Sequence, residues 1–511
     1  MATEVHNQGQ NKPKTKLKRG LVDDDYTSDE EVPDIKPKIE KIDRSRHCPY
    51  LDTIDRTVLD FDFEKLCSVS LSHLNVYACL VCGKYFQGRG QNSHAYTHSV
   101  HIGHHVYLNL RSLKFYCLPD NYEIIDSSLE DIKYVLKPTF GKEHIKLLDT
   151  TGKVSRALNG NTYIPGIVGL NNIKANDYLN VVLQALAFVP PVRNYFLCDE
   201  NYKDTKRPPG DTMFPLVQRF GELVRKIWNP RNFKTHVSPH EMLQAVVSCS
   251  KKKFQFTEQG DPIEFLSWFL NGIHLTLNGT KKARSSVIYK SFRGEMKQWS
   301  RKLPQTDDKA LEEKILQQEE YKETEQTLPF LYLTLDIPAS PLFKDELEQN
   351  AIPQVPLINL LQKFNGVQEK EYKTYYDVTV KKFVLTKLPK YLILFIKRFT
   401  NNTFFVEKNP TIINFPVKDL DMSEYLSSEP SVQEANKHRC YDLVANISHG
   451  GEFISDKRDS SKGTYQVHVL HKGSKQWHEL QDLHVKDILP PMITLSESYI
   501  QIWELQKNSS K

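Results

Sequence analysis

Residues 169–184 read Gly169-Leu-Asn-Asn-Ile-Lys-Ala-Asn-Asp-Tyr-Leu-Asn-Val-Val-Leu-Gln184, and this stretch decides the fold. In its second half, apolar residues recur with the 3.6-residue period of one helix face, at Leu179, Val182, Leu183, Leu186 and Ala187. Asn176 or Asp177 is expected to supply the N-cap, and Pro190-Pro191 is expected to end the helix. Taken alone, the stretch predicts an ordinary buried helix with a good cap.

Length and composition allow a large, well-packed protein. The chain has 511 residues, of which 39% are hydrophobic and 11% aromatic, so two or more domains with a sizeable core are expected. No apolar run reaches the roughly 20 residues of a membrane helix, and no secretory signal is expected. The net charge of +5 is mild for this length, and it does not by itself argue for nucleic-acid binding.

Cysteine and histidine residues cluster near the start of the chain. The eight cysteines are Cys48, Cys67, Cys79, Cys82, Cys117, Cys198, Cys249 and Cys440. Five of them precede residue 120, which favours a metal site over a disulfide framework and indicates a reducing compartment.

The pattern Cys79-x-x-Cys82 is followed by a dense group of histidines, which are His94, His98, His101, His104 and His105. Zinc takes four nitrogen or sulfur ligands that short spacings bring together. We predict one structural zinc ion held by Cys79, Cys82, His98 and His104. The alternative is a surface histidine cluster beside two buried cysteines.

The first 46 residues are dense in Lys, Asp, Glu and Pro and almost lack aromatic residues. Such a composition cannot bury a core, so a disordered tail is predicted. The basic run at residues 12–19 is either an ordinary solvated segment or a nuclear localisation signal.

Residues 169–184 resemble the first sequence box of the ubiquitin-specific protease family. The matching positions are Gly169, Leu170, Asn172, Tyr178, Asn180, Leu183 and Gln184. Two departures concern the chemistry. Asp177 stands where the family has its nucleophilic cysteine, and Ala175 stands where it has the asparagine that stabilises the oxyanion. A carboxylate at a helix start keeps the favourable dipole interaction but cannot form the family's thioester.

Later segments resemble further boxes of this family in the same order. Residues 258–266 predict a helix that starts at Asp261-Pro262, and residues 330–338 predict a strand that ends at a proline. The charged residues 305–327 predict a solvated helix between them. Residues 383–399 form an apolar run that predicts one central strand, covered on both faces.

The remaining catalytic positions of the family are also altered. Residues 441–451 and 498–503 resemble its last core strands, but His449 is not the expected base. Thr464 stands in the place of the catalytic histidine, and Gln481 in the place of the Asp or Asn that orients it. Threonine has no group that titrates near neutral pH. We therefore expect no enzyme activity.

Residues 47–145 resemble the ubiquitin-protease-type zinc finger, whose richer members bind further zinc ions. Here Cys48, Cys67 and Cys117 lack partner ligands, as does His94, so these three cysteines are expected to be small buried side chains. The resemblance makes Arg89 a candidate remnant of a pocket for the C-terminal Gly-Gly of ubiquitin. The alternative is a plain protein-docking module.

The resemblance implies an α+β chain with a zinc finger followed by a papain-like protease fold of thumb, palm and fingers. We expect a tail at 1–46, the finger at 47–145, a linker at 146–163, an inactive protease-like domain at 164–506 and a tail at 507–511. The second domain is expected to hold no zinc, with Tyr372, Tyr375 and Tyr376 packing in place of the family's second Cys-x-x-Cys pair.

The chain pairs a zinc finger that lacks some metal ligands with a protease-like domain that lacks the catalytic Cys and His. This combination resembles an inactive branch of the family that acts in pre-mRNA splicing. That resemblance implies a nuclear scaffold that helps to hold or recruit the tri-snRNP, with tri-snRNP proteins as partners and no membrane contact. Small nuclear RNA would be contacted indirectly or through phosphates. The alternatives are a ubiquitin-binding reader, a residual deubiquitinase or a direct RNA-binding protein.

Overall fold

The structure is a computed structural model, and it describes residues 48–205, 211–304, 318–338, 352–373, 377–401, 405–451, 454–456 and 463–507. The charged tail with its basic run, the segment 305–317 and the tyrosines 375 and 376 lie outside the described residues. Within the described part, no helix is long and apolar enough to span a membrane.

The N-terminal module is built on a five-stranded antiparallel sheet of order β2-β1-β3-β4-β5. Its strands are β1 Val76–Cys79, β2 Tyr85–Gln87, β3 Val106–Asn109, β4 Phe115–Cys117 and β5 Tyr122–Ile124. Its helices are α1 His94–Ile102 and α2 Glu130–Leu136. Helix α3 Lys142–Leu147 follows, and its buried residue Ile145 belongs to the core of the later helices. As predicted, Cys48, Cys67 and Cys117 are buried.

Short strands and helices follow, with one hairpin inside the expected linker. The strands are β6 Ser155–Arg156, β7 Thr162–Tyr163, β8 Gly169–Leu170 and β9 His236–Val237. The helices are α4 Asp177–Ala187, α5 Pro190–Leu197, α6 Glu200–Lys203, α7 Phe214–Ile227, α8 His240–Cys249, α9 Pro262–Thr276 and α10 Val287–Phe292. Strands β6 and β7 pair, so residues 146–163 are more ordered than a plain polar connector.

The C-terminal half is mainly β-structure. Its larger strands are β10 Gly294–Leu303, β11 Thr324–Phe330, β12 Leu333–Asp336, β15 Val378–Lys387, β16 Tyr391–Lys397, β21 Cys440–Gly450, β23 Thr464–His471, β24 Gln476–Gln481, β25 His484–Ile488 and β26 Ser498–Leu505. Smaller elements are β13 Gln354–Pro356, α12 Leu357–Leu361, β14 Lys370–Lys373, β17 Phe399–Asn401, β18 Phe405–Lys408, β19 Ile412–Asn414, β20 Leu420–Asp421, α13 Pro430–Ala435, β22 Ile454–Asp456 and α14 Pro490–Thr494.

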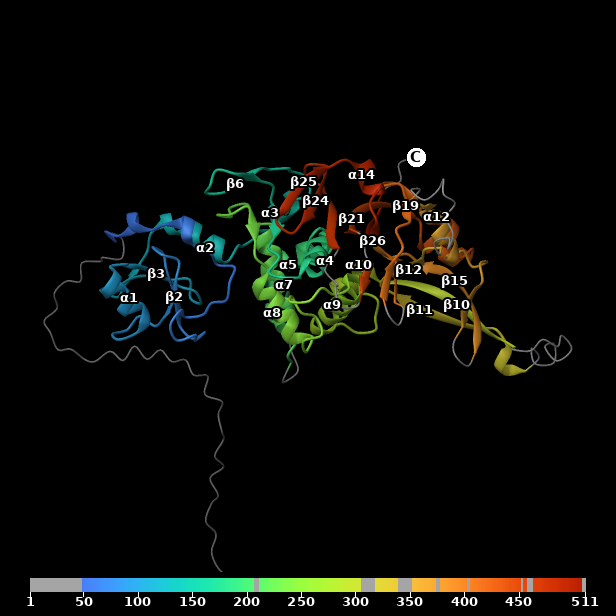
Figure 1. The fold of residues 1–511 in the computed structure, drawn as a ribbon, viewed down its shortest axis with the longest axis horizontal. Helices are drawn as coiled ribbons and strands as arrows, with labels where there is room; N and C mark the ends of the chain where they lie inside the picture. Colours follow the sequence, from blue (N-terminus) through green and yellow to red (C-terminus); the bar gives the residue numbers. More distant parts are fainter. Residues whose placement is uncertain are drawn as a thin grey trace, which may run out of the picture. The chain divides into compact units, whose positions relative to one another are not determined.

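Two sheets organise this half. One is four-stranded, in the order β11-β10-β15-β14. The other is eight-stranded, with seven strands in the order β12-β16-β26-β21-β23-β24-β25 and the eighth, β20, paired with β21. Helix α4 packs on β21, β23 and β24 of the larger sheet, and Figure 1 shows it beside β21 and β24. All eleven residues of α4 are buried, so this helix joins the helical half to the sheet.

The sequence prediction for α4 was correct for the helix and for the N-cap position, but wrong for the capping bond and for the role of the prolines. Asn176 occupies the N-cap position, but its side chain makes no capping hydrogen bond. It bonds instead to the N–H of Ile173 and to the side chain of Asn180. The proline pair does not terminate α4, which ends at Ala187. Pro190 opens the next helix, where a missing N–H costs nothing.

Three other predictions need correction or refinement. The predicted solvated helix at 305–327 is wrong for residues 324–327, which belong to strand β11 and pair with β10. The predicted strand at 330–338 forms only as β12, four residues long. The apolar run at 383–399 is two strands rather than one, because Leu388-Pro389 separates β15 in one sheet from β16 in the other. The helix start at Asp261-Pro262 is confirmed.

Candidate metal centre and the surroundings of Asp177

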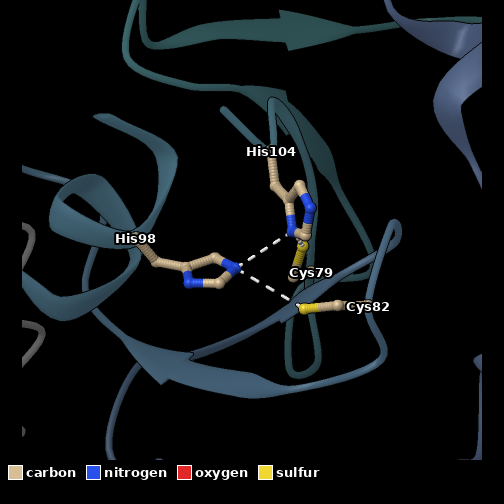
Figure 2. A group of neighbouring side chains, drawn as sticks. All are labelled: Cys79, Cys82, His98 and His104. Carbon is tan, nitrogen blue, oxygen red and sulfur yellow. Dashed lines mark hydrogen bonds between the residues drawn. The ribbon is translucent and has the colours of Figure 1, made fainter. Parts of the chain in front are cut away.

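The four predicted metal ligands come together from three neighbouring elements (Figure 2). Cys79 ends strand β1, and Cys82 lies in the turn before β2. His98 lies on α1, and this helix ends at Ile102 with Gly103 as its C-cap, whose φ of +75° is left-handed. The turn at Gly103 reverses the chain, so that His104 faces back toward His98.

Their distances match a tetrahedral zinc site. His98 Nε2 lies 3.2 Å from His104 Nδ1 and 3.5 Å from Cys82 Sγ, and Cys79 Sγ lies 3.5 Å from His104 Nδ1. All four ligand atoms lie within 4.8 Å of one another. A zinc ion bound at about 2.0–2.3 Å from each ligand would separate neighbouring ligands by about 3.3–3.8 Å. The four side chains therefore fit zinc with little movement.

The chemistry of the donors agrees with a metal site. Hydrogen bonding between the Cys79 and Cys82 side chains lowers the pKa of Cys82 and raises the pKa of Cys79, so the two thiols share one proton. A thiolate is the form that binds zinc. The His98 ring stacks on Phe86 with a centroid distance of 4.2 Å, which fixes its orientation. No other group of this kind occurs among the described residues.

The neighbouring histidines and cysteines lie outside the metal cluster and make other contacts. His105 Nδ1 lies 2.7 Å from the carbonyl oxygen of Leu118, and its ring packs on Tyr50 at 3.9 Å. The His101 side chain is exposed. Cys67 Sγ accepts hydrogen bonds from the N–H groups of Val69 and Ser70, both at 3.4 Å. Cys67 is thus tied into its own loop.

Asp177 is the first residue of α4 and is only 3% exposed. Its Oδ2 accepts hydrogen bonds from the backbone N–H of Tyr465 at 3.0 Å and from Gln259 Nε2 at 2.7 Å. Gln259 Nε2 also donates to the carbonyl oxygen of Gly463 at 3.0 Å. One carboxylate oxygen therefore joins α4, strand β23 and the loop before α9.

The second carboxylate oxygen of Asp177 differs from the first in its hydrogen bonding. Oδ1 is buried and has no hydrogen-bond partner among the described residues. Burial raises the pKa of Asp177, while the hydrogen bonds from Tyr465 and Gln259 partly oppose that rise. The neutral acid is therefore more favourable here than for an exposed aspartate. A carboxyl group in this state is a poor nucleophile.

Thr464 and Gln481 also meet, as their place in the sequence predicts. Gln481 Nε2 donates to Thr464 Oγ1 at 2.8 Å. Thr464 is next to Tyr465, whose N–H binds Asp177. The structure thus gathers Asp177, Thr464 and Gln481 at one place. Neither Thr464 nor Gln481 can take up a proton near neutral pH.

Ala175 contributes only a methyl side chain to this region, and its backbone N–H donates to the carbonyl oxygen of Phe256 at 2.9 Å. His449 is 1% exposed, and its ring meets Phe399 and Tyr465 edge-on at centroid distances of 5.3 and 4.8 Å. Burial is the main cause that lowers the pKa of His449, to about 3. This histidine is therefore neutral near pH 7.

The sequence reading missed the role of Asp482. Its two carboxylate oxygens accept hydrogen bonds from Asn172 at 3.0 Å and from Asn180 at 3.3 Å. Its carbonyl oxygen accepts the N–H of Leu170 at 2.9 Å. Asn172 and Asn180 had matched the family box, and two amides with no assigned partner were the available signal for such an acceptor.

Comparisons with known proteins agree with this geometry. The family model described as ubiquitin carboxyl-terminal hydrolase matches residues 168–503, and that described as Zn-finger in ubiquitin-hydrolases and other protein matches residues 67–129. The chain belongs to the ubiquitin carboxyl-terminal hydrolase family. Its N-terminal module is the zinc finger of this family, and together with the Cys/His cluster this indicates zinc binding.

The similar proteins include splicing proteins. The chain is 64% identical to Ubiquitin carboxyl-terminal hydrolase 39 of Homo sapiens, over 95% of this chain and 85% of the relative. It is 45% identical to the Probable mRNA-splicing protein ubp10 of Schizosaccharomyces pombe, over 89% and 88%. The crystal structure of an essential yeast splicing factor matches with a TM-score of 0.69 and 30% identity, over 90% of this chain and 100% of that one. These likenesses support a role in pre-mRNA splicing.

Proposed function

We propose that this protein is a non-catalytic splicing factor, a pseudo-deubiquitinase scaffold that supports tri-snRNP stability or recruitment during spliceosome assembly in the nucleus. One observation carries the proposal. Asp177, at the place of the family's nucleophile, holds α4 to β23 through the N–H of Tyr465. A group that bears a structural contact of this kind has little freedom to attack a substrate.

The chemistry of the neighbouring side chains supports the same proposal. Cysteine-protease hydrolysis needs an activated nucleophile, a base within hydrogen-bond reach and a group that orients the base. The corresponding places hold Asp177, Thr464 and Gln481, and Thr464 and Gln481 bond to each other. Ala175 offers no side-chain donor to an oxyanion. Removing one such donor alone typically lowers kcat by about 10²–10³-fold.

Partners and cofactor follow from the same reasoning. Tri-snRNP proteins are the proposed partners, and small nuclear RNA would be reached indirectly or through its phosphates. The finger would hold a single structural zinc ion on Cys79, Cys82, His98 and His104, which lie within 4.8 Å of one another. We propose that residues 47–145 and 164–506 are the two folded domains, joined by the segment 146–163.

Ubiquitin is a second candidate partner, because Arg89 occupies a place that resembles the family's pocket for the ubiquitin C-terminus. Its guanidinium carbon lies 4.3 Å from the centroid of the Tyr116 ring, and Nη1 donates to Asn121 Oδ1 at 2.5 Å. A ubiquitin tail would therefore have to compete with these two contacts. Calorimetric titration of ubiquitin tests this function, and the absence of heat and of shifted NMR peaks would eliminate it.

The test of the main proposal is a tagged pull-down of the full chain from nuclear extract at moderate salt. Both proteins and small RNAs are identified in the eluate. Recovery of spliceosomal small nuclear RNAs together with tri-snRNP proteins is the expected result. Recovery of ubiquitin conjugates without those RNAs would contradict the scaffold function and would favour a ubiquitin reader.

A further inference from the structure

The segment that joins α9 to α10 is basic and lacks acidic residues. Residues 265–294 contain no Asp or Glu. They contain five basic side chains of Lys or Arg, which are Lys281, Lys282, Arg284, Lys290 and Arg293. Of these, only Arg293 forms an ion pair in the described part of the chain, at 3.9 Å from Glu295. The other four are exposed, and we call them the basic surface.

Hydrogen bonds hold the backbone beneath this surface. Ser285 Oγ lies 2.8 Å from the carbonyl oxygen of Thr280 and 2.9 Å from that of Lys282, and it accepts the N–H of Thr280 at 3.0 Å. Arg293 donates to the carbonyl oxygen of Lys281. The two adjacent lysines therefore project from a fixed turn, so less conformational entropy is lost when they bind a ligand.

Helix α10 is anchored in the same way. Ser286 caps it by accepting the N–H of Tyr289, and Ser286 Oγ lies 2.7 Å from Nδ1 of the buried His274. The rings of His274 and Tyr289 stack at 3.6 Å, and the guanidinium of Arg293 lies 5.1 Å from the Tyr289 ring. Since Tyr289 is already stacked and covered, it does not offer a free face to a nucleobase.

We propose that Lys281, Lys282, Arg284 and Lys290 bind the phosphate backbone of RNA without reading its sequence. This inference rests on the proposed splicing function and gives it a specific RNA contact. The exposed residues between 278 and 290 are all polar or cationic, whereas protein interfaces are usually centred on apolar or aromatic anchors. Four exposed cations that form no ion pair in the described part of the chain instead suit a chain of phosphates.

The test is a fluorescence anisotropy titration of a labelled single-stranded RNA of mixed sequence with the purified full chain, at several salt concentrations. Four phosphate contacts predict a slope of about −3 in a plot of log K against log salt, since each contact on a single strand contributes about −0.7. The double variant Lys281→Glu/Lys282→Glu should weaken binding at least about tenfold and reduce the slope to about −1.4.

The matched control is Lys251→Glu/Lys252→Glu, which makes the same change in net charge on another exposed turn. That turn has acidic neighbours, since Lys253 pairs with Glu264 at 3.3 Å. We expect less than about a threefold effect of the control variant on RNA affinity. Equal effects of the two double variants would overturn the proposal, because they would indicate attraction by net charge alone.

Two further outcomes also decide the question. Absence of RNA binding by the wild-type chain would overturn the basic surface as an RNA site, while tri-snRNP recovery in the pull-down would still support the scaffold function. An acidic peptide is also tested as a competitor of the labelled RNA. If it displaces that RNA at a lower concentration than unlabelled RNA does, the RNA proposal is overturned in favour of an acidic protein partner. Circular dichroism and zinc content should be unchanged in both double variants.

Discussion

Oδ2 of Asp177 accepts a hydrogen bond of 3.0 Å from the backbone N–H of Tyr465, although 288 residues separate the two in the sequence. Gln259 adds a bond of 2.7 Å to the same oxygen. Asp177, which resembles the family's nucleophile in its sequence position, thus links the first turn of α4 to the start of strand β23. We expect the stability of the fold to depend on this contact.

We expect Asp177→Ala to lower the free energy of unfolding by about 1–3 kcal/mol, because it leaves the buried N–H of Tyr465 and the amide of Gln259 without their acceptor. Asp177→Asn is the matched control, since its amide oxygen can accept both bonds, and it should cost less. Urea unfolding of the three proteins measures the difference. A destabilisation by Asn as large as that by Ala would contradict the hydrogen-bonding role.

The same pair predicts a pH dependence. Burial raises the pKa of Asp177 above the ordinary value of 3.8, so the folded protein holds this proton more tightly than the unfolded chain. The stability contributed by Asp177 is full below pH 3.8 and decreases as the pH rises through the raised value. The stability advantage of wild type over Asp177→Asn should therefore shrink with rising pH. An advantage that grows with pH would contradict this sign.

Gln259→Glu would place a second carboxyl group beside Asp177. Two adjacent buried carboxyl groups cannot both ionise at low cost, so they would share one proton. We expect near wild-type stability in acid and a progressive loss as the pH rises toward neutrality. Gln259→Met, which removes the amide without adding charge, should show no such additional slope. Parallel pH profiles of the Glu and Met variants would refute the prediction.

His449 should stay neutral throughout the physiological range, because its folded pKa is about 3. Its folded pKa lies below the ordinary value of 6.5, so the stability it contributes is full above pH 6.5 and decreases as the pH falls toward 3. NMR of ¹³C-labelled histidine, with His449→Gln to assign the signal, measures the titration. A midpoint near 6.5 would show that the ring is not buried as described.

Zinc should be bound in a ratio of one ion per chain. Cys82→Ser should lower the zinc content toward zero and unfold the finger, since structural zinc sites couple binding to folding. His101→Ala is the control. His101 lies on α1, as the ligand His98 does, but its side chain is exposed and outside the ligand cluster. Metal analysis by mass spectrometry gives the ratio. Full zinc content in the Cys82 variant, or more than one ion in wild type, would contradict the assignment.

Short-range patterns were enough to predict the zinc cluster. Cys79 and His104 are 25 residues apart, and the Cys-x-x-Cys turn with a left-handed Gly103 determines most of the geometry locally. The N-terminus of α9 was predictable for the same reason. The Asp261 side chain accepts the N–H of Ile263, with Pro262 as the first helical residue.

Structure and contacts that depend on residues distant in the sequence were not predicted. Residues 324–327 are charged and polar, which suggested a helix. They form a strand because every residue of β11 pairs with a residue of β10. The role of Asp482 depends on Asn180, 302 residues away. The hydrogen bonds of Asp177 come from Gln259 and Tyr465, and no local pattern around residue 177 encodes them.

The most direct measurement is the splicing of a reporter pre-mRNA in nuclear extract depleted of this protein, after adding back either the wild type or Asp177→Asn. A non-catalytic scaffold predicts that both proteins restore splicing to the same extent, because the amide can keep the contacts of the carboxylate. Restoration by wild type alone would indicate a chemical role for Asp177 and contradict the account. Restoration by neither protein would contradict the splicing function itself.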